Sequence, residues 1–138
     1  MKPVIILVTA GVVLGIFSMT LFVEHNETNV LPQARLVELM ASDRSLLLLD
    51  VRTAKEFTEG HIPGAINIPH ELLSARSAEL GNDKSRQIVV YCQSGYRAGV
   101  AEEILRAAGF SQLQHLQGDM RGWSAAGRQV SKSTAASQ

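Results

Sequence analysis

The sequence has a single cysteine, Cys92, among its 138 residues, so no disulfide can form within the chain. A lone cysteine is either a small buried core residue or a group kept for its reactivity. The chain also lacks an excess of charge of either sign, because it has 13 lysines and arginines and 13 aspartates and glutamates. Without the basic excess of a polyanion-binding protein, we predict no nucleic-acid partner.

Charged residues are absent between Lys2 and Glu24. The apolar stretch 4–23 has about 20 residues, which at about 1.5 Å per residue spans a hydrocarbon core of about 30 Å. Its end lacks a small-x-small cleavage site of the kind that signal peptides have. The sequence therefore predicts a transmembrane anchor at 4–23, with a cleaved signal segment as the alternative.

The charges around this stretch predict its orientation. The N-terminal amine and Lys2 precede it, whereas Glu24 and Glu27 follow it, and positive charge is retained on the cytoplasmic side of a membrane. We therefore expect residues 1–3 in the cytoplasm and the rest of the chain outside the inner (cytoplasmic) membrane. If the stretch is a cleaved signal instead, the mature protein is periplasmic or secreted.

Beyond residue 23 the pattern predicts one domain between two short segments. Residues 24–31 are expected to form a linker, 32–130 the folded domain, and 131–138 a disordered tail rich in serine, threonine and alanine. The continuous apolar run at 46–49 and the segment 87–91, with its apolar centre at 88–90, are typical of strands that are buried on both faces of a parallel sheet.

Helical patterns alternate with these strands. Alternation of this kind predicts an α/β fold around a mainly parallel sheet flanked by helices. Thr53 is expected to cap a short helix that Gly60 closes. The predicted helices are 32–41, 54–57, short segments around 71–73 and 77–80, 98–108 and a last one around Trp123. The shorter predicted strands are 65–68 and 113–116.

The loop that starts at Cys92 lies between the strand at 87–91 and the helix predicted from Ala98. In open α/β sheets, ligands bind beyond the carboxyl ends of the strands, and here that position holds a thiol. Only a few per cent of free thiols are ionised at neutral pH, whereas the unpaired N–H groups of a helix start and the cation of Arg97 favour an anion. Gly95 lets the backbone fold closely around that anion. The pattern therefore favours a reactive Cys92 over an inert one.

Two segments resemble the signatures of single-domain rhodaneses. The pattern Cys92-x-x-Gly95-x-Arg97 is similar to the active loop of that family, and residues 50–69 (DVRTAKEFTEGHIPGAINIP) are similar to its other signature. The resemblance covers roughly 32–130 and implies a rhodanese-like fold. One departure is the pair Gly118-Asp119, where the family often has two glycines.

The resemblance implies a two-step sulfur transfer. Cys92 attacks the outer sulfur of a donor such as thiosulfate, sulfite leaves, and a thiol, cyanide or a protein thiol then takes the sulfur from the Cys92 persulfide. Backbone N–H groups of residues 93–97 are expected to hold the persulfide's charge, and Arg97 to pair with the donor's sulfonate. The predicted substrate-binding residues are Gln93, Ser94, Gly95, Tyr96 and Arg97.

Other titratable residues have less specific expectations. Asp50 and Arg52 are candidate supporting residues at the end of the neighbouring strand, with a structural ion pair or a turn-capping role as the alternative. His25, His70 and His115 lack metal-ligand spacing with one another or with Cys92, so we predict no metal and no cofactor.

Two alternative functions stay open at the level of sequence. Phosphatases and arsenate reductases of a related fold have a Cys-x5-Arg loop that surrounds a tetrahedral oxyanion. The Cys-x4-Arg spacing found here is one residue shorter and favours sulfur. The other alternative is a non-catalytic rhodanese-like interaction or sulfur-carrier module, against which the presence of Cys92 argues.

Overall fold

The structure, a computed structural model, describes residues 29–133. The predicted membrane segment at 4–23, the residues before it and most of the predicted linker lie outside the described residues. Within 29–133, no helix is long and apolar enough to cross a membrane.

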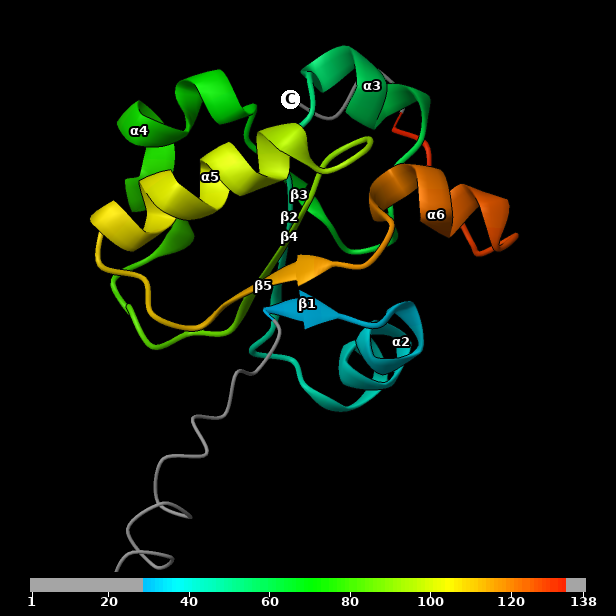
Figure 1. The fold of residues 1–138 in the computed structure, drawn as a ribbon, viewed down its shortest axis with the longest axis horizontal. Helices are drawn as coiled ribbons and strands as arrows, with labels where there is room; N and C mark the ends of the chain where they lie inside the picture. Colours follow the sequence, from blue (N-terminus) through cyan, green and yellow to red (C-terminus); the bar gives the residue numbers. More distant parts are fainter. Residues whose placement is uncertain (1–28, 134–138) are drawn as a thin grey trace, which may run out of the picture.

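A parallel sheet forms the centre of the domain (Figure 1). Its strand order is β1-β5-β4-β2-β3, and each neighbouring pair runs parallel. The predicted α/β fold with a mainly parallel sheet is therefore confirmed. The strands are β1 (Val30–Leu31), β2 (Leu47–Asp50), β3 (Ile66–Asn67), β4 (Ile88–Tyr91) and β5 (Leu113–Leu116).

Helices cover both faces of this sheet, which is why every residue of β2 and β4 is buried. Figure 1 shows α4 and α5 over one face and α2 and α6 on the other side. The helices are α2 (Gln33–Ser42), α3 (Ala54–Glu59), α4 (Leu73–Arg76), α5 (Tyr96–Ala107) and α6 (Asp119–Ala125), with short 3-10 turns η1 (His70–Leu72) and η2 (Ser77–Leu80).

Successive side chains of a strand point to opposite faces, so the sheet separates two hydrophobic clusters. Leu49 of β2 packs in the cluster that contains Leu105 of α5. Its neighbour Leu48 packs in the cluster that contains Leu36 of α2 and Trp123 of α6. The strongly apolar strands therefore form the middle layer of three.

The short helix α3 begins and ends as the sequence predicts. The Thr53 side chain accepts a hydrogen bond from the Glu56 N–H at 3.2 Å, and the Glu56 carboxylate accepts one from the Thr53 N–H at 3.0 Å. This reciprocal pair satisfies two N–H groups that the first helical turn leaves free. The helix ends at Gly60. The capping pair also fixes the position of the Glu56 carboxylate, which binds Arg97 at the candidate site.

Several predicted boundaries differ from the structure, and three of the differences change the role of a segment. Helix α5 begins at Tyr96, two residues before the predicted start at Ala98. Residues 30 and 31 form an edge strand rather than a linker, because two residues are too short for a periodic pattern to reveal. The predicted tail begins at 131, yet Ser131 exchanges two backbone hydrogen bonds of 2.9 Å with His61. Those bonds use only main-chain groups, so the serine-rich composition does not reveal them.

Tyr91, the last residue of β4, supplies a buried polar contact that can be tested. Its hydroxyl accepts a hydrogen bond from the Ile62 N–H at 3.1 Å, and both residues are fully buried. Removing that hydroxyl leaves the N–H buried without a partner. We expect Tyr91→Phe to lower the free energy of unfolding by about 1–3 kcal/mol, measured by urea denaturation.

The matched control for this prediction is Tyr96→Phe, because the Tyr96 side chain is 81% exposed. It should change the free energy of unfolding by less than about 0.5 kcal/mol. Equal unfolding midpoints for the two variants would contradict a structural role for the Tyr91 hydroxyl.

Candidate functional site

Cys92 directly follows β4 at the carboxyl edge of the sheet. Its side chain is only 1% exposed, and its Sγ accepts a hydrogen bond from the Gly95 N–H at 3.0 Å. Gly95 adopts a φ of +117° where the chain turns from this loop into α5, a region that side chains strongly disfavour. The loop therefore wraps closely around the sulfur, and glycine at position 95 allows it to do so.

The predicted substrate-binding residues divide between this loop and the next helix. Gln93, Ser94 and Gly95 lie in the loop, and Gly95 precedes the first helical residue. Tyr96 and Arg97 form the start of α5, so the segment 92–97 is a short loop and a helical turn rather than one ring. Ser94 and Tyr96 are exposed, whereas Gln93 and Arg97 are half-buried.

Arg97 is held by Glu56 of α3. The guanidinium Nη1 and Nη2 donate to the two carboxylate oxygens at 2.8 and 2.9 Å, a bidentate pair. This pair lowers the pKa of Glu56 to about 2. Glu56, and to a smaller extent Cys92, raise the pKa of Arg97, which therefore stays cationic. Glu56 is not among the site residues that the sequence predicts, because its capping position alone says nothing of a partner on α5.

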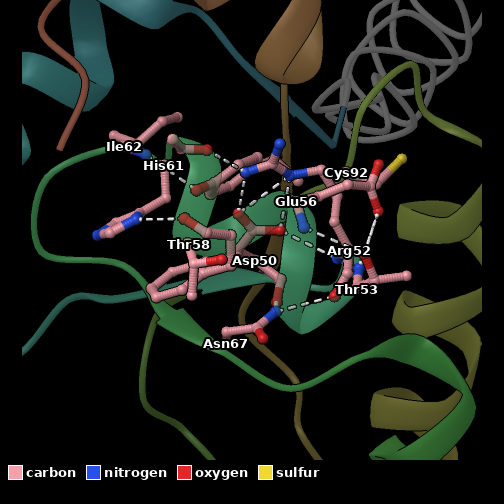
Figure 2. A network of polar contacts seen from close by, with 12 residues as sticks. Asp50, Arg52, Thr53, Glu56, Thr58, His61, Ile62, Asn67 and Cys92 are labelled. Atoms are coloured by element: carbon pink, nitrogen blue, oxygen red, sulfur yellow. Dashed lines mark hydrogen bonds and ion pairs between the residues drawn. The ribbon is translucent and has the colours of Figure 1, made fainter. Parts of the chain in front are cut away.

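Asp50 and Arg52 form a buried ion pair at the end of β2 (Figure 2). Arg52 Nη2 lies 2.6 Å from Asp50 Oδ2 and also donates to the Gly60 carbonyl at 2.7 Å. Asn67 Nδ2 donates to the carbonyls of both residues at 2.9 Å. These contacts join β2 to β3 and to the end of α3. This is the geometry of a structural ion pair, the alternative to a supporting role for Asp50 and Arg52 in the active site.

A cavity of about 320 Å³ lies beside the cysteine loop. Gln93, the residue that follows Cys92, lines this cavity together with Arg52. Its wall therefore combines two acidic residues and one arginine with neutral residues. The lining residues are Arg52, Glu56, Glu59, Gly60, Gln93, Met120, Ser124 and Val130.

The amino end of α6 holds the other side of the loop. The Met120 and Arg121 N–H groups donate to the carbonyls of Cys92 and Gln93 at 3.0 and 3.1 Å. The Asp119 carboxylate accepts the Cys92 N–H at 2.9 Å. In the sequence, Asp119 stands out only as a departure from a glycine pair. Its place three residues after the end of β5, the strand next to β4, is the signal that could have marked it.

His115 of β5 lies against two carboxylates behind the loop. Its Nε2 is 3.1 Å from Asp119 Oδ2, and its Nδ1 is 2.9 Å from Glu102 Oε1. Asp119, and then Glu102, raise the pKa of His115 to about 10. The ring is therefore an ion-pair partner. In the part of the chain that the structure describes, no group of three histidine, cysteine or acidic side chains could hold a metal ion.

Comparison with known proteins agrees with this fold and loop. The family described as rhodanese-like domain matches residues 33–126. The chain belongs to this family. A sulfurtransferase of Allochromatium vinosum is 33% identical over 95 residues, which are 69% of this chain and 87% of that protein. The thiosulfate sulfurtransferase PspE of Escherichia coli is 36% identical over 70 residues, 51% of this chain and 67% of that protein. These relatives support a role in sulfur transfer.

Solved structures show the same fold. The Alr3790 protein from Anabaena has a TM-score of 0.67 at 30% identity, with 75% of this chain and 84% of that chain covered. A rhodanese-related protein from Thermoplasma volcanium has a TM-score of 0.66 at 28% identity, with 75% and 98% covered. The rhodanese-like fold predicted from the two sequence signatures is therefore confirmed.

The pair between Glu56 and Arg97 predicts a change in acid stability. Because the pKa of Glu56 is lowered from 4.5 to about 2, its ionised form stabilises the folded state above pH 4.5. That stability is lost as the pH falls through about 2. We expect Glu56→Gln to lower the free energy of unfolding at neutral pH and to flatten its decline in acid, measured by urea denaturation across that range.

Glu59→Gln is the matched control on the same helix. Glu59 is exposed and pairs with Lys55 only at 3.9 Å, so its loss should change the free energy of unfolding by less than about 0.5 kcal/mol. If Glu56→Gln and wild type declined equally steeply in acid, the ion pair would not be the cause.

Proposed function

We propose that this protein is a sulfurtransferase in which Cys92 carries a sulfane sulfur between a small donor and a thiol or cyanide acceptor. The observation that carries the proposal is the Cys92 loop itself. It lies at the carboxyl edge of a parallel sheet, and the Gly95 N–H points at the sulfur from 3.0 Å. Membership of a family that includes sulfurtransferases supports it.

The transfer has two balanced steps. In the first, the Cys92 thiolate attacks the outer sulfur of thiosulfate, the sulfur–sulfur bond of the donor breaks, and sulfite leaves with the bonding electrons. In the second, an acceptor thiolate attacks the terminal sulfur of the Cys92 persulfide. The acceptor becomes a persulfide, or thiocyanate where it is cyanide, and the Cys92 thiolate is restored.

The electrostatics of the loop favour an anionic sulfur. The Gly95 N–H donates to it, in the way that an oxyanion hole donates to developing negative charge. Arg97 places a permanent cation at the same loop, although Glu56 already occupies both of its outer nitrogens. A donor sulfonate would therefore have to share this guanidinium with the carboxylate of Glu56.

Sulfite release tests the proposal. With thiosulfate as donor and cyanide as acceptor, we expect Cys92→Ser to reduce the rate of sulfite release by about 10³-fold or more, because no persulfide can form. Ser74→Ala, an exposed substitution on α4, serves as the control and should retain the wild-type rate. Sulfite release that survives Cys92→Ser would contradict the proposal. Absence of release in wild type and variant alike would favour the interaction or carrier module instead.

We also propose that residues 4–23 anchor the protein in the inner membrane, with the domain outside the cytoplasm. The support is the uncharged apolar stretch and the charges that flank it. In membrane fractions washed with alkaline carbonate we expect the protein to stay in the pellet with an intact N-terminus by mass spectrometry. In spheroplasts, added protease should remove the domain. A truncated soluble protein would indicate a cleaved signal and contradict the anchor.

A further inference from the structure

Asp119 has a backbone conformation that is unusual for its residue type. Its φ is +54°, and within residues 29–133 every other positive φ belongs to a glycine. A non-glycine residue in this region costs about 1 kcal/mol or more, although aspartate tolerates it better than most. Contacts of the carboxylate therefore have to offset a strain that a glycine at this position would avoid.

Those contacts converge on the two residues that hold the sulfur. Asp119 Oδ1 accepts the N–H of Cys92 at 2.9 Å. On the other side of the loop, a Cβ atom added to Gly95 would lie 3.4 Å from Asp119 Oδ2, so the carboxylate packs against the Cα of Gly95. Because the Gly95 N–H donates to Sγ, Asp119 fixes both ends of the turn around the sulfur.

A carboxylate at this place also has an unfavourable effect. Its negative charge opposes the formation of a thiolate or persulfide in the same loop, because like charges at short range disfavour ionisation. His115 supplies the opposite charge, with Nε2 at 3.1 Å from both oxygens of Asp119. The other ring nitrogen faces Glu102 of α5, which is buried and also contacts Arg106 at 3.1 Å and Asn29 at 3.0 Å.

We propose that Asp119 and His115 form a positioning pair in which Asp119 fixes the Cys92 loop and the charge of His115 cancels that of the carboxylate at the sulfur. The pair thereby sets the net charge that lies next to the sulfur. Neither side chain is a catalytic residue here, because each acts through the loop. The proposal rests on the proposed function insofar as Cys92 is taken to be the reactive group.

The surroundings of His115 keep it cationic under ordinary conditions. The carboxylates of Asp119 and Glu102 raise its pKa to about 10, from a usual value of 6.5. The group therefore stabilises the folded state fully below pH 6.5, and that contribution is lost as the pH rises through about 10. At neutral pH the sulfur thus faces a neutralised carboxylate.

The test is the pH dependence of Cys92 alkylation by iodoacetamide, with the full-length chain in detergent. In His115→Gln the carboxylate is no longer balanced, so the pH of half-maximal rate should rise by roughly one unit. In Asp119→Asn the amide oxygen still accepts the Cys92 N–H but the negative charge is gone, so the midpoint should fall by a similar amount. The double variant should return near the wild-type midpoint.

Opposite shifts separate this electrostatic role from a merely structural one, which would move both variants in the same direction. His70→Gln and Glu103→Gln are the matched controls, because these residues lie outside the Asp119, His115 and Glu102 cluster, and they should leave the midpoint unchanged. Shifts of the same sign, or no shift in variants that keep the wild-type circular dichroism spectrum, would overturn the proposal.

A second measurement does not depend on variants. Nitrogen chemical shifts of the His115 ring in the wild-type protein should show both nitrogens protonated from about pH 6 to pH 8. Titration of the ring near its usual pKa of 6.5 would overturn the pair. Alkylation of Cys92 requires no sulfur donor, so this test is independent of the sulfurtransferase assay. Opposite shifts of the alkylation midpoint would support the pair even if the protein released no sulfite. The missing sulfite release would then count only against the sulfurtransferase function.

Discussion

The parallel register of β2, β4 and β5 determines which groups meet at the sulfur. Asp50 at the end of β2 pairs with Tyr91 at the end of β4, so the chain leaves both strands at the same edge of the sheet, and Cys92 emerges beside the ion pair of Arg52. On the other side, Val90 pairs with His115 of β5. Since alternate side chains of a strand share a face, His115 lies on the same face as Cys92, beneath α5.

Every acidic side chain around this edge has a cationic partner. Asp50 is paired with Arg52, Glu56 with Arg97, Asp119 with His115, and Glu102 with both His115 and Arg106. Burying an unpaired charge is costly, so each pair stabilises the carboxylate that it contains. The carboxylates therefore hold the loops in place, while their cationic partners largely cancel their negative charge. The Gly95 N–H stays directed at the sulfur.

The sequence predicted the features that depend on local pattern. Apolar runs identified β2 and β4, the Thr53 and Gly60 signals identified α3, and the position of Cys92 after a buried strand identified the loop. It did not reveal that Glu56 contacts Arg97, or that Asp119 contacts Cys92, because each contact joins residues that only the fold brings together. At the level of sequence Asp119 is only a lost glycine, because the position of its carboxylate depends on the order of the strands.

The central claim is that Cys92 carries sulfur, and the mass of the native protein tests it most directly. After incubation with thiosulfate and removal of the excess, the peptide that contains Cys92 should be heavier by the mass of one sulfur atom. Treatment with a thiol should return it to its original mass and transfer the sulfur to that thiol. A peptide that keeps the mass of a free cysteine under these conditions, in a protein that is folded and alkylated normally by iodoacetamide, would contradict the account.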